Sequence, residues 1–443
     1  MTTTVPRGKA FLSQLSTAHS LPYLRYWIIG LVFLATVINY LDRQTLSVVA
    51  PVLREQFAMT NTQYSYATVA FLLAYTIFNG ISGRVLDLVG SRNGYMLIMA
   101  CWSVAAMAHS LVTGVWGLVV CRFFLGAGEA GNWPAGAKVS TEWFPVRERA
   151  LANGVFNSGA AVGAVIATPV VAFITYDYGW RWAFVLVGSA GFVWLLVWWR
   201  FYQIPERHPL LAPSELKHIS SDNQSKNSGE EIPIPGFWSL FQLRFVWALT
   251  LSKIFLDPVW YLYIFWFAEY LKRQRGFDLA AIGTYGWIPF LSADVGNLFG
   301  GWMSGKLIDR GWSANDARKG TITLFAALMA SAIPAVLVAN VWLAIGLISC
   351  ATMGYTAINA NMLTLPSDVF PPNAVSTVFG MASMGAGFGG MIFMWATGKV
   401  VDAFSYKPIF FAAGIMPLVS ALLLWTLVPR VQRVRPEELG AYL

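Results

Sequence analysis

The chain has 443 residues, of which 56% are hydrophobic and only 12% are charged. Soluble domains carry about 25% charged residues, so this composition excludes an ordinary water-soluble protein and indicates one that is solvated by lipid. The formal net charge of +8 does not indicate nucleic-acid binding, because no dense basic patch with interleaved aromatic residues lies outside the apolar segments.

Apolar runs long enough to cross a bilayer as helices, about 20 residues each, recur along the whole chain. Segments of strictly alternating polarity, which would indicate a membrane β-barrel, are absent from the sequence. We therefore predict an all-α membrane protein whose twelve spans cover 26–50, 65–86, 94–113, 115–138, 152–175, 182–203, 245–271, 281–304, 320–339, 341–366, 376–399 and 407–429. An even number of spans puts both termini on the same side of the membrane.

A polar segment at 204–243 interrupts this pattern. It is rich in Ser, Asn, Pro and charged residues, and we expect a solvated linker there. The linker separates an N-terminal half, residues 1–203, from a C-terminal half, residues 244–443, with six predicted spans in each half.

The loop charges predict the orientation. Most Lys and Arg residues of the loops lie on the side that holds the termini, and cytoplasmic loops carry the excess of positive charge. Both termini are therefore expected in the cytoplasm of a bacterial cell, with the chain crossing the inner membrane. Lys272, Arg273 and Arg275 are a local exception to this bias.

The two halves share sequence features in the same order. Gly83–Asp87 (GRVLD) recurs as Gly305–Asp309 (GKLID), and Phe144-Pro145 recurs as Phe370-Pro371. An internal repeat of this size is typical of transporters whose halves move around a binding site near the membrane midplane.

The segment Gly83–Arg92 resembles the loop motif of the major facilitator superfamily. The resemblance implies that fold, with twelve transmembrane helices in two pseudo-symmetric six-helix halves. It also implies a gating role at the cytoplasmic ends of the halves for Gly83, Asp87, Gly90, Arg92 and, in the second copy, Asp309. Ser91 stands where the motif usually has a basic residue.

Two further stretches, Asn39–Arg43 and Arg122–Pro134, look like the organic-anion branch of that superfamily, the anion:cation symporters. The runs Gly128–Lys138, Ala152–Gly159 and Asp257–Trp260 are similar to bacterial hexuronate transporters. The resemblance implies symport of a sugar acid with protons, and it implies that Asp42 and Glu129 carry the coupling protons.

Six charged residues fall well inside the predicted spans: Asp42, Arg43, Arg122, Glu129, Lys253 and Asp257. Charge at membrane depth is costly and usually functional. The alternative is a set of buried ion pairs that only neutralise each other. For Lys253 and Asp257 the i, i+4 spacing fits a simple ion pair within one helix equally well.

Arg43 is predicted to bind the substrate carboxylate, because the planar guanidinium group matches two carboxylate oxygens. Tyr40 and Tyr75 are expected to add hydroxyl contacts, and Trp260 is expected to stack on the apolar face of the sugar. The remaining candidates for polar contacts with the substrate are Asn157, Lys253, Asp257, Asn359, Asn361 and Thr364. Hydrogen bonding between helices is an alternative for each of them.

Asp42 and Glu129 are the predicted proton carriers, with Arg122 as the partner that tunes Glu129. Burial raises the pKa of a carboxyl group in general, whereas a neighbouring arginine lowers it. A substrate anion that competes for the arginine would remove the counter-ion of the acid, which would then take up a proton.

We therefore predict a monomeric, proton-coupled importer of hexuronates such as glucuronate or galacturonate, embedded in the lipid bilayer. An aldonate or other organic-anion symporter on the same scaffold is the alternative, followed by a sensor that no longer transports. The sequence does not favour an enzyme, a cofactor or a metal, because its four His residues are not obviously paired and no nucleophile motif is present.

Overall fold

The protein is described by a computed structural model, which covers residues 21–145, 148–220, 240, 242–370, 372–428 and 431. These residues form helices joined by short loops, and no strand occurs among them. Residues 1–20 and 221–239, which bear on the predicted orientation and linker, lie outside the described part.

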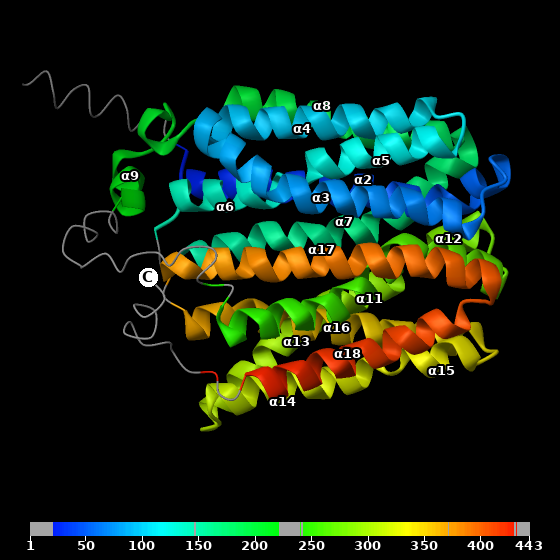
Figure 1. Ribbon diagram of the computed structural model, residues 1–443. Helices are drawn as coiled ribbons and strands as arrows, with labels where there is room; N and C mark the ends of the chain where they lie inside the picture. Colours follow the sequence, from blue (N-terminus) through cyan, green and yellow to red (C-terminus); the bar gives the residue numbers. More distant parts are fainter. Residues whose placement is uncertain are drawn as a thin grey trace, which may run out of the picture.

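The first helix group packs together the elements α2 to α8, and α9 follows it (Figure 1). Their bounds are α2 (Leu24–Gln56), α3 (Asn61–Val89), α4 (Ser91–Ala108), the 3-10 turn η1 (His109–Leu111), α5 (Val115–Glu129), α6 (Asn132–Trp143), α7 (Arg149–Tyr178), α8 (Trp180–Phe201), the 3-10 turn η3 (Pro205–Arg207) and α9 (Pro213–Ser220).

The second helix group packs together the elements α11 to α18 (Figure 1). Their bounds are α11 (Arg244–Arg275), α12 (Leu279–Tyr285), α13 (Ile288–Asp309), α14 (Ala314–Met329), α15 (Ala332–Leu337), α16 (Val341–Val369), α17 (Pro372–Ala403) and α18 (Lys407–Leu427). Helix α9 lies at one end of the molecule and α12 and α15 lie at the opposite end. We call these the α9 end and the α12 end.

Each predicted span falls on one helix or on two consecutive helices. Within the described residues, nine helical segments are long and apolar enough to cross a membrane, and the spans predicted at 65–86, 115–138 and 281–304 are not among them. The span at 115–138 is divided between α5 and α6. Pro134 has no N–H to donate to the carbonyl oxygen of Ala130, which instead accepts a hydrogen bond of 3.4 Å from Nδ2 of Asn79.

Glycines allow the closest helix crossings inside each group. A Cβ atom at Gly159 or Gly163 of α7 would lie 2.6 Å from a carbonyl oxygen of α2, and one at Gly385 of α17 would lie 2.6 Å from the carbonyl oxygen of Thr250 in α11. These repeat-related glycines therefore fasten α7 to α2 and α17 to α11. They do not themselves form the boundary between the two groups.

The boundary between the groups is formed by α2, α3 and α7 on one side and α11, α12, α13 and α17 on the other. Gly398 of α17 packs against Ser65 of α3, and Gly387 packs against Thr76. Closer to the α9 end, Gly83 and Gly380 have no atom within 4 Å of their Cβ positions. The close contacts between α3 and α17 are therefore concentrated toward the α12 end.

The start of the predicted linker is packed against the first group instead of being fully solvated. Glu215 of α9 accepts hydrogen bonds from the backbone N–H groups of Leu24 and Arg25, at 3.1 and 3.3 Å. These are donors that a helix N-terminus leaves free. Arg25 also bridges Glu215 and Glu148, and His218 lies 2.8 Å from Glu148.

The pKa of Glu148, at the N-terminus of α7, is lowered in this network. Burial alone would raise this pKa, but the hydrogen bond from His218 and the charge of Arg25 lower it more. The ionised form of Glu148 is therefore favoured, and it helps to fasten α9 to the ends of α2 and α7.

Candidate anion and proton site

The charged residues of the first group converge as the sequence predicts. Asp42 and Arg43 lie in the middle of α2, Arg122 and Glu129 lie in α5, and all four side chains are buried. Nη2 and Nε of Arg43 lie 2.9 and 3.0 Å from Oε2 of Glu129. The ion pair thus joins Glu129 to Arg43, a choice of partner that the sequence alone leaves open.

Arg122 lies beside this pair and is incompletely satisfied. Its Nη2 donates a hydrogen bond of 3.3 Å to the carbonyl oxygen of Arg43. Its Nε and Nη1, together with Oδ2 of Asp42 and Oε1 of Glu129, are buried and have no hydrogen-bond partner among the described residues. Such atoms are rare in native proteins because each is costly to bury. Their concentration here makes this cluster the part of the molecule best suited to receive a polar ligand or a proton.

Aromatic rings surround the two guanidinium groups. The guanidinium carbon of Arg43 lies 4.9 Å from the ring centres of both Tyr40 and Tyr75, and 5.1 Å from that of Phe71. The guanidinium carbon of Arg122 lies 4.9 Å from the ring centre of Phe71, so Phe71 contacts both arginines. Cation–π contacts stabilise a desolvated cation, and within the described residues Arg43 has Glu129 as its only ion-pair partner.

A second polar cluster lies in the second group. Nζ of Lys253 is 2.9 Å from Oδ2 of Asp257 and 3.3 Å from Oδ1 of Asn359. The hydroxyl of Tyr355 donates to Oδ1 of Asp257 at 3.2 Å, and its ring stacks on Trp260 with 4.9 Å between ring centres. The ion pair within one helix that we kept as an alternative is thus present, and it forms part of a larger polar cluster.

Tyr355 did not emerge from the sequence analysis. It lies four residues before Asn359 in α16, so the two side chains share one face of the helix. That spacing was the only local signal. The contact with Asp257 joins residues 98 positions apart and can be seen only in the folded chain.

The two clusters face each other across the boundary between the groups. Phe265 of α11 packs edge-on against Phe71 of α3, with 5.8 Å between ring centres, and the guanidinium carbon of Arg122 lies 5.8 Å from the ring centre of Phe265. Tyr261, one turn after Asp257 in α11, stacks on Phe265 with 6.2 Å between ring centres. A ligand held between the clusters would therefore contact both helix groups.

Three predicted residues lie elsewhere. Asn361 donates hydrogen bonds to the carbonyl oxygens of Gly300 and Ala357, at 3.0 and 2.9 Å, and Thr364 bonds its own helix at the carbonyl oxygen of Asn361. Two residues along a helix turn the side chain by about 200°, so Asn361 points away from the face that carries Asn359. Asn157 is only partly buried, in the first turns of α7 toward the α9 end.

The residues of the predicted gating motif lie where α3 joins α4. Gly90 has φ of +84°, a conformation that favours glycine. Arg92 donates a hydrogen bond of 2.7 Å to the carbonyl oxygen of Trp199, at the negative end of α8. This partner lies in the same helix group as Arg92. Asp309 is exposed at the end of α13, and the side chain of Asp87 lies outside the described residues.

The arrangement is suited to binding and proton exchange. The described residues contain no group of three His, Cys, Asp or Glu side chains that could hold a metal ion. What they do offer is a guanidinium group paired with a protonatable acid, with amide, hydroxyl and aromatic groups facing it. Such a set recognises an anionic, hydroxyl-bearing ligand.

Comparison with known proteins agrees with this description. The chain matches the family described as Major Facilitator Superfamily over residues 32–379 and 304–441. It is 33% identical over 407 residues to a hexuronate transporter of Escherichia coli K12, covering 91% of this chain and 94% of the relative. It is 34% identical over 308 residues to a galacturonate transporter of Dickeya chrysanthemi, covering 69% and 89%.

Among solved structures, the inward open xylose transporter of E. coli has a TM-score of 0.72 at 14% identity, covering 94% of this chain and 99% of that one. The helical architecture and the family match agree, and members of this family transport solutes and are not enzymes. The chain therefore belongs to the major facilitator superfamily, as a multi-pass membrane transporter.

Proposed function

We propose that the protein imports hexuronates, such as glucuronate or galacturonate, together with protons by alternating access. The relatives named as hexuronate and galacturonate transporters support the substrate class. The buried pair of Arg43 and Glu129 is the observation that carries the coupling. In this proposal the α9 end and both termini face the cytoplasm, because most loop Lys and Arg residues lie on that side.

Substrate and proton compete through one cation. The carboxylate of the sugar acid binds Arg43 and displaces Glu129, which is the present occupant. A buried carboxylate that has lost its counter-ion is strongly disfavoured, so Glu129 takes up a proton. The loaded site then contains the guanidinium cation, the substrate anion and a neutral acid, and it carries less net charge when it is closed off from water.

Asp42 is the second proton carrier. It is buried, its Oδ2 has no hydrogen-bond partner among the described residues, and Arg122 is within electrostatic range. A negative charge that enters a cell with a potential of about 100 mV, negative inside, costs about 2.3 kcal/mol. One proton cancels this cost, and a second would make the potential drive uptake.

The second cluster recognises the body of the sugar. Lys253, Asp257 and Asn359 present donors and acceptors suited to hydroxyl groups. The stacked rings of Trp260 and Tyr355 form an apolar platform, which fits the flat face of a pyranose ring. An open-chain aldonate has no such face, so this platform favours a hexuronate over the aldonate alternative.

A counterflow assay with the purified protein in liposomes tests the proposal. Labelled glucuronate should enter faster when a pH gradient, acidic outside, is imposed, and unlabelled galacturonate should compete with it. Galactonate should compete about 2- to 10-fold more weakly, because one aromatic stacking contact contributes about 0.5–1.5 kcal/mol. Uptake that ignores the gradient would exclude proton symport, and stronger competition by galactonate would favour the aldonate symporter.

A further inference from the structure

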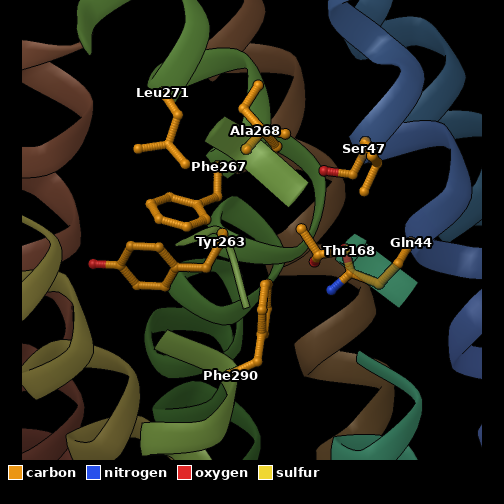
Figure 2. A pocket seen from close by; sticks show the side chains of 11 residues that line it. Gln44, Ser47, Thr168, Tyr263, Phe267, Ala268, Leu271 and Phe290 are labelled. Atoms are coloured by element: carbon orange, nitrogen blue, oxygen red, sulfur yellow. The ribbon is translucent and has the colours of Figure 1, made fainter. Parts of the chain in front are cut away.

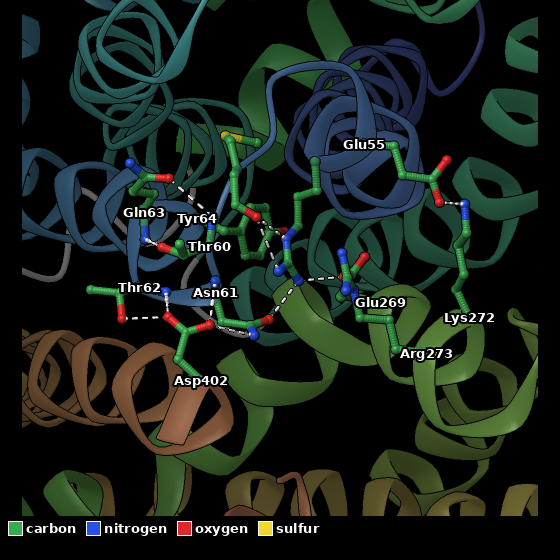
Figure 3. A network of polar contacts seen from close by, with 12 residues as sticks. Glu55, Thr60, Asn61, Thr62, Gln63, Tyr64, Glu269, Lys272, Arg273 and Asp402 are labelled. Carbon is green, nitrogen blue, oxygen red and sulfur yellow. Dashed lines mark hydrogen bonds and ion pairs between the residues drawn. The ribbon is translucent and has the colours of Figure 1, made fainter. Parts of the chain in front are cut away.

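The α12 end carries a polar network that neither the family motif nor the substrate site accounts for (Figure 3). It joins the end of α2 and the start of α3, from the first group, to the ends of α11 and α17, from the second. We call it the α12-end latch; its members are Arg54, Glu55, Asn61, Thr62, Glu269, Lys272, Arg273 and Asp402.

The centre of the latch is a buried ion pair between the two groups. Arg54 of α2 contacts Glu269 of α11, and both side chains are almost completely inaccessible to solvent. Arg273 contacts the same carboxylate from its own helix, and Asn61 accepts a hydrogen bond of 2.5 Å from Arg54. The buried charge of Arg54 in the first group is therefore balanced by a carboxylate of the second group, which Arg273 also contacts.

The second part of the latch is a carboxylate at a helix N-terminus. Oδ1 of Asp402, at the end of α17, accepts from the backbone N–H and the side-chain amide of Asn61, at 2.8 and 2.7 Å. Its Oδ2 accepts from the backbone N–H and the hydroxyl of Thr62, at 2.7 and 2.6 Å. These backbone groups have no partner within α3, and the positive end of the helix attracts an anion.

The latch accounts for the basic residues that break the charge bias of the loops. Lys272 lies 2.6 Å from Glu55, an exposed pair across the boundary, and Arg273 supports Glu269. Arg275 instead donates to the carbonyl oxygens of Val338 and Ala335 at the end of α15, at 2.7 and 2.6 Å. All three positive charges have structural partners on this side of the membrane.

The interior between the latch and the substrate site is packed, because Gln44, Tyr263, Leu271 and Phe290 are all buried there. A cavity of about 10 Å³ lies there, with Gln44 and Thr168 on one side and Tyr263 and Phe290 on the other (Figure 2). That volume holds at most one water molecule. Gln44 follows Arg43 in α2, and Leu271, which also lines the cavity, precedes Lys272 in α11. The latch therefore covers a packed layer that separates the site from the α12 end.

We propose that the α12-end latch sets the equilibrium between the state closed on this side and the state open on it. The proposal rests on the alternating access of the proposed function. When the groups separate at this end, the ion pair between Arg54 and Glu269 breaks and both side chains become hydrated. Asp402 also leaves the N-terminus of α3. The free-energy cost of separating charged groups is small when water hydrates them, so the closure remains reversible.

Distance measurement between two spin labels tests the latch without reference to any substrate. Cys101, Cys121 and Cys350 are first replaced by Ser, and labels are attached after Asp177→Cys at the end of α7 and Phe404→Cys beyond α17, both exposed and both near the α12 end. The population with a long distance is then compared between the otherwise unchanged protein and latch variants.

Glu269→Gln should raise the long-distance population at least about tenfold, because Arg54 would remain buried without a counter-charge. Asp402→Asn, at an exposed position where folding is not at risk, should raise it by up to about fivefold. The control Asp368→Asn removes an ion pair with Arg318, 3.3 Å, inside the second group near the α9 end, and it should leave the distribution unchanged.

Unchanged distances in both latch variants would overturn the proposal, and so would an equal shift in the control. Hexuronate counterflow, measured on the same samples, separates this result from the proposed function. A latch-dependent shift in distance without any hexuronate transport refutes the substrate and leaves the latch, whereas normal transport without a shift refutes the latch alone.

Discussion

The variant Glu129→Gln separates proton coupling from the binding of the substrate anion. The amide has the shape of the acid, so an acceptor stays near Arg43, but the ion pair of 2.9 Å becomes a hydrogen bond from the guanidinium cation to a neutral amide. Close pairs of opposite charges have coupling energies that start at about 1.5 kcal/mol, and the variant loses this coupling while it keeps the hydrogen bond. The competitor of the substrate at Arg43 is therefore weaker by about 1.5 kcal/mol or more, and substrate affinity should rise at least about tenfold.

Accumulation should change in the opposite direction. In a symporter that carries one proton per anion, a pH gradient of about one unit supports about tenfold accumulation at zero membrane potential, because one pH unit corresponds to about 1.36 kcal/mol. Glu129→Gln cannot carry its proton, so accumulation should fall about tenfold for each pH unit of the gradient, while exchange of labelled for unlabelled substrate continues.

The assay is uptake into liposomes with the potential clamped at zero by potassium and an ionophore, with and without the pH gradient. Glu142→Gln is the matched control, because Glu142 accepts hydrogen bonds from Ser91 and Tyr202, at 2.6 and 2.8 Å, outside the cluster. The control should accumulate substrate as the parent does. Full accumulation by Glu129→Gln would remove this acid from the mechanism.

Three other variants probe separate parts of the molecule. Arg43→Ala should weaken substrate binding by about 30-fold or more, since truncating one partner of a buried charged pair costs about 2–5 kcal/mol, and Arg43→Lys should restore little because an ammonium group lacks the fork; near-native affinity in equilibrium binding would contradict the carboxylate role. Tyr355→Phe keeps the stacked ring but loses the bond to Asp257, so hexuronate affinity should fall about 2- to 10-fold, and an unchanged inhibition constant in counterflow would place the sugar elsewhere. Glu148→Gln should lower the melting temperature near neutral pH by the equivalent of less than about 1 kcal/mol. Because the pKa of Glu148 is lowered in the folded protein, this difference from the parent should persist above the ordinary carboxyl pKa of 4.5 and disappear as the pH falls below it. A difference in melting temperature that grows in acid would contradict the assignment.

The positions of the helices followed from the sequence because hydrophobic length is a local property. The interruption at Pro134 did not follow, because a proline inside an apolar run either kinks or ends a helix depending on neighbours such as Asn79. The docking of α9 was also missed. Glu215 meets the start of α2 across 191 positions in the chain, and no local pattern encodes that contact.

The sequence indicated which residues belong to the candidate site better than it indicated which of their side chains contact each other. Charge inside an apolar helix singled out Arg43 and Glu129, yet only the folded chain brings these two side chains, from α2 and α5, into contact. Helix periodicity separates Asn359 from Asn361, but which of the two faces the boundary depends on how α16 is rotated. The contact between Arg54 and Glu269 spans 215 positions and had no signal beyond an unexplained excess of positive charge.

The glycine crossings between α7 and α2 have a consequence for how the substrate site behaves during the transport cycle. Because Gly159 and Gly163 of α7 lie directly on carbonyl oxygens of α2, these helices have no room to slide past each other. The first group should therefore swing as one body, and the distance between Arg43 and Glu129 should be the same whichever side of the membrane the site faces. In the proposed cycle that pair therefore responds to whether substrate is bound but not to which side the site faces. The direction of net transport is then determined only by the substrate gradient and the proton gradient.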